Sequence, residues 1–264
     1  MKRYIKLYFV YLDCAIKGRL EYKKDAVIGI FSFLIANLIS FLSLMFVVNA
    51  IPDLNGWNKY ELGFLYGFSM LPRAVDHMFT DSIWYVGHQY VRKGIIDRFL
   101  IRPVNILFQV IAEIFQPEAF GELIMGVLLL VACGRNITIE WSFSKVVMAL
   151  IAIFFGAVVF SAIKLITASV AFWTKRSAPL MSMVYNFADF AKYPIQIYHP
   201  AVRMIMMFII PFGLVISIPA DVLLHGSYSS WLVSLVIILV ATVFWGIGCF
   251  IWIKGLRQYE SSGN

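Results

Sequence analysis

Charged side chains stand inside several long apolar stretches of this 264-residue chain, where a charge is costly and needs a partner or a task. The residues concerned are Arg73, Asp76, Glu113, Glu118, Glu122 and Lys164. Arg73 and Asp76 are three residues apart, so in a helix they share one face and can neutralise each other. Either they form a structural ion pair, or they line a cavity and contact a substrate.

The three glutamates fall within one apolar stretch and could lie along one helix. Such a row of carboxylates would suit a path for a cationic substrate or a relay of protons. They could equally form ion pairs with Lys164 or Arg203 from neighbouring helices. Lys164 lies near the middle of its own stretch and needs an acidic partner, and these glutamates are the candidates that the sequence offers.

Motifs of the common enzyme sites are missing from the sequence. Gly121 and Gly126 are spaced as in a phosphate-binding loop, but Val127 stands where that loop has lysine. Neither the HExxH of zinc proteases nor the GxSxG of serine hydrolases occurs. The histidines and cysteines are scattered along the chain: His77, His88, His199, His225, Cys14, Cys133 and Cys249. We therefore expect a chain that is not an enzyme and that holds no metal or cofactor of its own.

The composition places these charges in a lipid environment. Hydrophobic residues make up 61% of the chain and charged residues 14%, whereas about a quarter of the residues of a soluble domain are charged. A membrane span requires about 20 mostly apolar residues. We predict a single all-α membrane domain with six transmembrane helices, at about residues 26–48, 62–86, 107–132, 146–173, 201–218 and 231–253.

The basic residues predict how these spans are oriented. Counted from the N-terminus, alternate connections hold seven, four, three and two Lys and Arg residues, and the connections between them hold one, two and none. Lys and Arg accumulate on the cytoplasmic side of membrane proteins. We therefore expect both termini in the cytoplasm, together with the second and fourth connections.

Two segments are expected to lie at the membrane surface or to enter the membrane without crossing it. In residues 1–25, aromatic and aliphatic side chains recur at helical spacing among lysines, which favours an interfacial amphipathic helix over a disordered basic tail. In residues 211–228, Pro211, Gly213 and Pro219 interrupt an apolar stretch that is too short to cross. This second pattern predicts a re-entrant segment on the outer side.

Residues 91–102, in the second connection, mix apolar and charged side chains and end at Pro103. In a helix, Ile95, Phe99 and Arg102 would share one face. A short amphipathic helix on the cytoplasmic side could dock on a soluble partner or lie among lipid headgroups, and its periodicity favours neither.

Four stretches resemble permeases of the type-2 ABC exporter class, and most of all a compact bacterial branch whose operons often encode one ATPase and two different permeases. They are Trp57–Gly67 (WNKYELGFLYG), Gly94–Pro103 (GIIDRFLIRP), Asp189–Ile195 with its D-x-x-x-YP element, and Trp252–Gly263 (WIKGLRQYESSG). The resemblance extends over nearly the whole chain in order and spacing.

The resemblance implies a transport function in the bacterial cytoplasmic membrane. Two permeases, more often different than identical, would form a pathway for a hydrophobic or amphiphilic compound. Membrane lipid would surround them, and we expect no nucleic-acid partner. A separate ATPase dimer would bind ATP and Mg²⁺, and the coupling helix at residues 92–102 would transmit its closure. The residues that would carry this coupling are Arg92, Gly94, Ile95, Asp97, Arg98, Phe99 and Arg102.

Other functions remain open on the residues alone. An ion-coupled secondary transporter that uses Glu113, Glu118 and Glu122 is the main alternative, although six spans without an inverted repeat would be small for that class. A membrane-embedded enzyme lacks any recognisable nucleophile or metal site, and a membrane scaffold without transport activity remains a further alternative.

Overall fold

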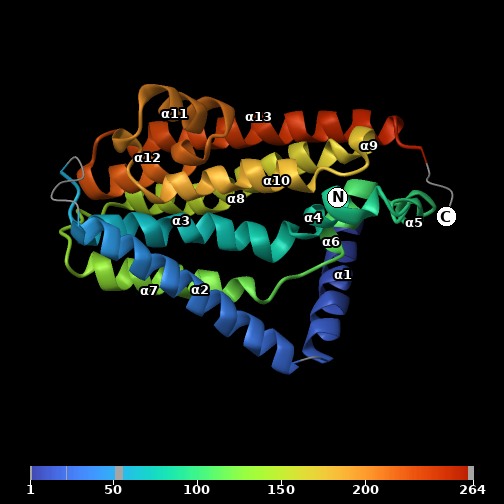
Figure 1. Ribbon diagram of the computed structural model, residues 1–264, viewed down its shortest axis with the longest axis horizontal. Helices are drawn as coiled ribbons and strands as arrows, with labels where there is room; N and C mark the ends of the chain where they lie inside the picture. Colours follow the sequence, from blue (N-terminus) through green and yellow to red (C-terminus); the bar gives the residue numbers. More distant parts are fainter. Residues whose placement is uncertain (1, 22, 51–55, 261–264) are drawn as a thin grey trace.

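The computed structural model describes residues 2–21, 23–50 and 56–260. Residues 1 and 22 of the expected interfacial segment, and residues 261–263 of the last family-like stretch, lie outside this part of the chain. Within it every regular element is a helix (Figure 1). In chain order they are α1 (Lys2–Glu21), α2 (Lys23–Ala50), α3 (Lys59–Thr80), α4 (Ser82–Tyr85), η1 (Val86–Tyr90), α5 (Asp97–Leu100), α6 (Ile106–Ala112), α7 (Ala119–Gly134), α8 (Phe143–Ser169), α9 (Ala171–Thr174), α10 (Ala178–Asn186), η2 (Phe187–Lys192), η3 (Ile195–Ile197), α11 (Pro200–Met204), η4 (Ile205–Ile209), α12 (Phe212–His225) and α13 (Ser230–Arg257).

Three of the described helices are long and apolar enough to cross a membrane: Lys23–Phe46, Phe143–Thr174 and Ser230–Arg257. A fourth candidate is the pair Pro200–Ile209 and Phe212–His225, which is bent by 101° and is either a broken span or a re-entrant loop. The helix α7 is apolar but short, and α3 carries several charges. Six spans therefore remain a prediction, whereas a multi-pass helical architecture is present.

The third predicted span, 107–132, is not one helix. The helix α6 ends at Ala112 and α7 begins at Ala119, with a turn between them. Pro117 explains the break, because proline has no N–H for the helical ladder and disfavours helical geometry in the residue before it. As a consequence, Glu113 and Glu118 stand at two helix ends and Glu122 lies inside α7.

The fifth predicted span, 201–218, is also wrong as a continuous helix. Ile210 has φ −128° and ψ 77°, far from helical values, and the chain turns there between η4 and α12. Pro211 follows directly, and a residue before proline is pushed towards extended geometry. The helix α12 then folds back into the bundle and ends at Gly226, whose positive φ of 67° suits a glycine cap.

Residues 178–192, which the sequence assigns to a cytoplasmic connection, form α10 and η2 instead. The backbone N–H of Ser177 donates to Gly87 O, so α10 starts beside η1. Lys192, at the end of η2, lies 5.5 Å from the ring centre of Tyr66 in the first half of α3. This segment therefore runs along α3 and α8, towards the end of the bundle where α11 lies (Figure 1).

The two ends of the bundle can be defined from contacts. At one end, called the hairpin end, Glu61 and Trp57 contact His225, and Lys145 donates to Leu223 O. The opposite end, called the tip end, comprises residues 84–102, 172–177 and 258–260. The start of α1 and the end of α13 both lie towards the tip end, and α1 runs across the bundle rather than along it (Figure 1).

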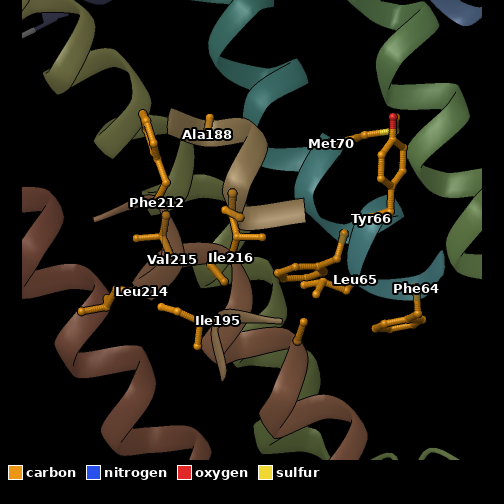
Figure 2. Packing of buried hydrophobic residues seen from close by; sticks show 14 of the residues in the cluster. Phe64, Leu65, Tyr66, Met70, Ala188, Ile195, Phe212, Leu214, Val215 and Ile216 are labelled. Atoms are coloured by element: carbon orange, nitrogen blue, oxygen red, sulfur yellow. The ribbon is translucent and has the colours of Figure 1, made fainter. Parts of the chain in front are cut away.

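The core forms where α3, α8 and α12 meet. Figure 2 shows Val215 and Ile216 of α12 between Phe212, on the same helix, and Leu65 of α3. On its other side α3 approaches α7 closely, because a Cβ on Gly67 would lie 2.9 Å from Gly126 O. Glycine, which has no side chain, allows the two helices to approach this closely. By contrast α2 is largely exposed, as suits a helix that faces lipid or another subunit.

Candidate functional site

The buried charges meet on one side of α3. Lys164, fully buried on α8, places its Nζ 2.8 Å from Asp76 Oδ2 and 2.7 Å from Asp81 Oδ1. Ser161 donates to Asp76 Oδ1 at 2.7 Å, and Thr80 Oγ1 lies 2.5 Å from the same oxygen. The glutamates expected as partners of Lys164 are therefore the wrong ones. The acids come from α3, because α8 packs against α3 at Pro72, where a Cβ on Gly156 would lie 2.9 Å from Pro72 Cβ.

Arg73 and Asp76 do not pair with each other, although they are three residues apart. Arg73 Nε lies 3.0 Å from Glu122 Oε1 on α7, and its Nη1 lies 3.3 Å from Asp189 Oδ1 on η2. Lys192 adds a second cation to Asp189, at 2.6 Å. Arg73 and Asp76 are thus neutralised by residues of other helices, Arg73 by α7 and η2 and Asp76 by α8, so the network holds helices together.

His77 and Tyr185 join these two groups of charges into one network. His77 Nδ1 lies 2.9 Å from Glu122 Oε2. The Tyr185 hydroxyl on α10 lies 2.9 Å from His77 Nε2 and 2.9 Å from Asp76 Oδ2. Neither residue was singled out from the sequence, because a lone histidine and a lone tyrosine carry no motif.

Asp76, His77 and Asp81 are close enough to offer three ligand atoms to a metal ion, since these atoms lie within 4.8 Å of one another. Lys164, however, already places its ammonium group against both aspartates. The positive charge that a cation would bring is thus supplied by a side chain, and the arrangement is better described as a polar network than as a metal centre.

Glu113 and Glu118 lie outside this network. Glu113 forms an ion pair with Arg98 and accepts a hydrogen bond from the Tyr90 hydroxyl at 2.8 Å. Glu118 contacts Arg19 of α1, at 3.4 Å. The three glutamates expected to form one row therefore serve three separate contacts, and only Glu122 is buried with the other intramembrane charges.

The predicted coupling segment, 91–102, folds as turns followed by a single helical turn, α5. Gly94 adopts a positive φ of 68°, which favours glycine, and so no continuous helix covers 91–102. Ile96 and Phe99 are buried. Leu100 and Ile101 project instead, and Ile101 is 84% exposed.

These two exposed residues form, with Arg102, the surface that we call the tip. The predicted shared face of Ile95, Phe99 and Arg102 is not formed, because Phe99 points into the protein and Arg102 points out. Sequence periodicity placed Leu100 only on a minor face with Asp97 and Arg98 and missed Ile101, since it assumed a regular helix.

Hydrogen bonds and an ion pair hold the tip and its flanking residues against α6 and α1. The Gln109 side-chain amide, in α6, donates to Phe99 O at 3.2 Å and to Val104 O at 2.9 Å. Arg102 Nη1 donates to the Tyr11 hydroxyl of α1 at 3.4 Å. Arg98 pairs with Glu113 just beyond the end of α6, so the tip is attached to the same break that interrupts the third predicted span.

A cavity of about 560 Å³ lies at the tip end of the bundle and reaches the polar network at Asp81. Its wall combines aromatic, basic and amide side chains with one carboxylate: Asp81, Trp84, Tyr85, His88, Gln89, Arg92, Gln116 and Arg176. Asp81 belongs to both regions, because it pairs with Lys164 and accepts a hydrogen bond from Gln116 at 3.2 Å. The buried network therefore reaches solvent at this wall.

Comparison with known proteins gives one match and one negative result. The family model described as "ABC-2 family transporter protein" matches residues 34–263, which is most of the chain and includes all the contacts of the polar network and of the tip except those of α1. No curated protein matches the chain. This family supplies the membrane permease component of ABC transporters, which associates with an ATPase component and carries no nucleotide-binding motif of its own. The chain belongs to the ABC-2 family of transporter proteins and is a multi-pass membrane permease.

Proposed function

We propose that this permease forms, with a second and different permease, the outward pathway for a hydrophobic or amphiphilic compound across the bacterial cytoplasmic membrane. A separate ATPase dimer, which binds ATP and Mg²⁺, drives the cycle from the cytoplasmic side. The termini lie on that side, together with the tip. The family assignment supports the permease role, and the location of the start of α1, the end of α13 and the tip towards one end of the bundle supports the orientation.

One observation carries the ATPase contact: an exposed apolar pair stands on a segment that is otherwise anchored. Ile101 and Leu100 project from the tip, whereas Ile96 and Phe99 beneath them are buried. An exposed isoleucine beside an arginine suits insertion into a groove of a soluble partner, where apolar surface and charge are both recognised. Because Gln109 and Glu113 tie the tip to α6 and to its C-terminal end, a force on the tip would reach the membrane helices.

The test is to co-express the permease with a candidate ABC ATPase from the same genome and to purify the complex through the permease. Ile101→Asp is expected to reduce the recovered ATPase at least about tenfold, because a carboxylate in an apolar groove is strongly disfavoured. Phe143→Asp is the matched control, since Phe143 is 79% exposed but begins α8 at the hairpin end. Unchanged thermal stability of Ile101→Asp shows that the loss is one of contact. Normal complex formation and normal transport by this variant would contradict the proposal.

The ion-coupled alternative rested on three glutamates in a row, and the structure separates them. The purified chain without ATPase is therefore expected neither to transport in response to a pH gradient nor to bind or hydrolyse ATP. Transport into vesicles that hold only this chain would restore the alternative.

A further inference from the structure

The contacts of His77 cannot be satisfied with its ring neutral and its neighbours ionised. Tyr185 has one hydroxyl hydrogen but lies 2.9 Å from two groups, Asp76 Oδ2 and His77 Nε2. The Asp76 carboxylate, held by Lys164, is only an acceptor, so the hydrogen belongs to the Tyr185–Asp76 contact. The contact between Tyr185 and His77 then requires a hydrogen on Nε2.

The other ring nitrogen also requires a hydrogen. Nδ1 of His77 lies 2.9 Å from Glu122 Oε2, and Glu122 is held as a carboxylate by Arg73 at 3.0 Å. A carboxylate only accepts, so Nδ1 must donate. With hydrogens on both nitrogens the ring is an imidazolium. Were the proton moved to Glu122 or to Asp76, the hydrogen bonds could be satisfied again, but the number of bound protons would stay the same.

The charges around His77 lead independently to the same count. The groups linked to His77 through the contacts of the network are Arg73, Asp76 and Asp81 of the α3 region, Glu122 of α7, Lys164 of α8, Tyr185 of α10, and Asp189 and Lys192 of η2, with Asp189 joined through Arg73 and Lys192. The four carboxylates outnumber the three permanent cations by one. Glu122 and Lys164 are almost completely buried, and an uncompensated charge is strongly disfavoured there. One added proton makes the network neutral.

We propose that the interior of this permease is a proton-binding site, in which His77 holds one proton as an imidazolium between Glu122 and Tyr185. The proton joins α3 to α7 and α10. The helix α3 is followed by α4 and η1 without a loop. A movement of the tip that shifts α3 must therefore either break the contacts of His77 with Glu122 and Tyr185 or move these two residues together with α3. This inference rests on the polar network alone and stands whether or not the tip binds an ATPase.

The test is nitrogen NMR of the full chain, labelled with ¹⁵N-histidine and held in lipid nanodiscs. His88→Gln, His199→Asn and His225→Gln leave His77 as the single histidine. These three side chains are exposed or half-buried, and asparagine keeps the cap that His199 provides to α11. At about pH 7.5 an exposed histidine, whose pKa is about 6.5, is about tenfold more neutral than charged. His77 is expected to show two protonated ring nitrogens.

Glu122→Gln is the matched variant that removes the need for the proton. The amide N–H can donate to Nδ1, leaving a neutral ring with its hydrogen on Nε2, and the network then holds three acids and three cations. One ring nitrogen is therefore expected to lose its proton in this variant under the same conditions. A wild-type His77 with an unprotonated ring nitrogen at about pH 7.5, or a ring that does not respond to Glu122→Gln, overturns the proposal. Normal ATPase binding by Glu122→Gln keeps this outcome separate from the test of the tip.

Discussion

At the scale of single residues, Lys164 shows how strongly the interior of this permease depends on charge pairing. Its ammonium group is fully buried and contacts two aspartates. Removing one partner of a buried ion pair leaves a charge without compensation, which costs more than the pair itself contributes.

Lys164→Met is therefore expected to lower the free energy of unfolding by about 3–5 kcal/mol. Adding Asp76→Asn should recover part of this loss, because the two substitutions affect one contact and an interaction energy of about 0.5–3 kcal/mol is usual for such pairs. Thermal unfolding in detergent measures both variants, and Lys93→Met serves as an exposed control that should change little. Additive losses in the double variant would show that the two groups do not interact.

The residue scale also shows what the sequence could reveal about the site. It identified Arg73, Asp76, Glu122 and Lys164 as charges that need partners, and all four lie in the network. It could not identify the partners, because spacing along one helix says nothing about which neighbouring helix faces each side chain. Asp81, a further charge within the second predicted span, was not among the candidate residues, yet it is the second acidic partner of Lys164.

At the scale of elements, the contact between α3 and α7 depends on small residues. Gly67 and Gly126 bring the two backbones together, and a Cβ on Gly126 would lie 2.9 Å from both Gly67 O and Leu71 Cδ2. The backbone cannot move aside as a flexible side chain could. The four-residue spacing of Gly63 and Gly67 is typical of close helix approach, but spacing within one helix does not identify the helix that approaches.

Gly126→Ala is accordingly expected to destabilise the protein by about 1–3 kcal/mol, as overpacking of a tight interior does. Gly246→Ala, in α13, is the matched control, since its Cβ would meet no atom within 4 Å. That substitution should be neutral or should stabilise by about 0.5–1 kcal/mol, because alanine favours a helix interior over glycine. Melting temperatures of the two variants compare these effects directly, and equal shifts would mean that the interface tolerates a methyl group.

Element boundaries were least predictable where proline or glycine changes the backbone. Hydropathy joined α6 to α7 and α11 to α12, because all four are apolar and hydropathy does not register a break. Pro117 was visible in the sequence and, weighed against hydropathy, would have divided the third span, whereas Pro211 was used only to predict the re-entrant segment at 211–228 and not to end the fifth span. The helical turn at the tip was shortened for a related reason, the positive φ of Gly94.

At the scale of the whole molecule, the structure and the sequence disagree about which segment makes the fifth passage along the bundle. The sequence places residues 174–200 in a cytoplasmic connection and the span at 201–218. In the structure α10 and η2 run along α3 and α8, and Lys192 reaches the level of Tyr66, nearer the hairpin end than Arg73. The residues that directly follow Lys192, in η3, therefore lie towards the hairpin end.

Single cysteines test this difference in intact cells, after Cys14, Cys133 and Cys249 are replaced. Reference cysteines at Glu140 and Tyr228, both exposed near the hairpin end, should react with a reagent that does not cross the membrane.

Cysteines at Lys93 and Arg176, exposed at the tip end, should react only after the cells are opened. The informative position is Gln196, an exposed residue of η3 that the sequence-based topology places in the cytoplasm. If α10 and η2 make the fifth passage, a cysteine at Gln196 reacts from outside at a rate within about tenfold of Tyr228, because both then face the same aqueous compartment. Reaction at Gln196 only in opened cells, as at Arg176, would place the fifth passage after residue 200 and would make the bent pair α11–α12 a broken span.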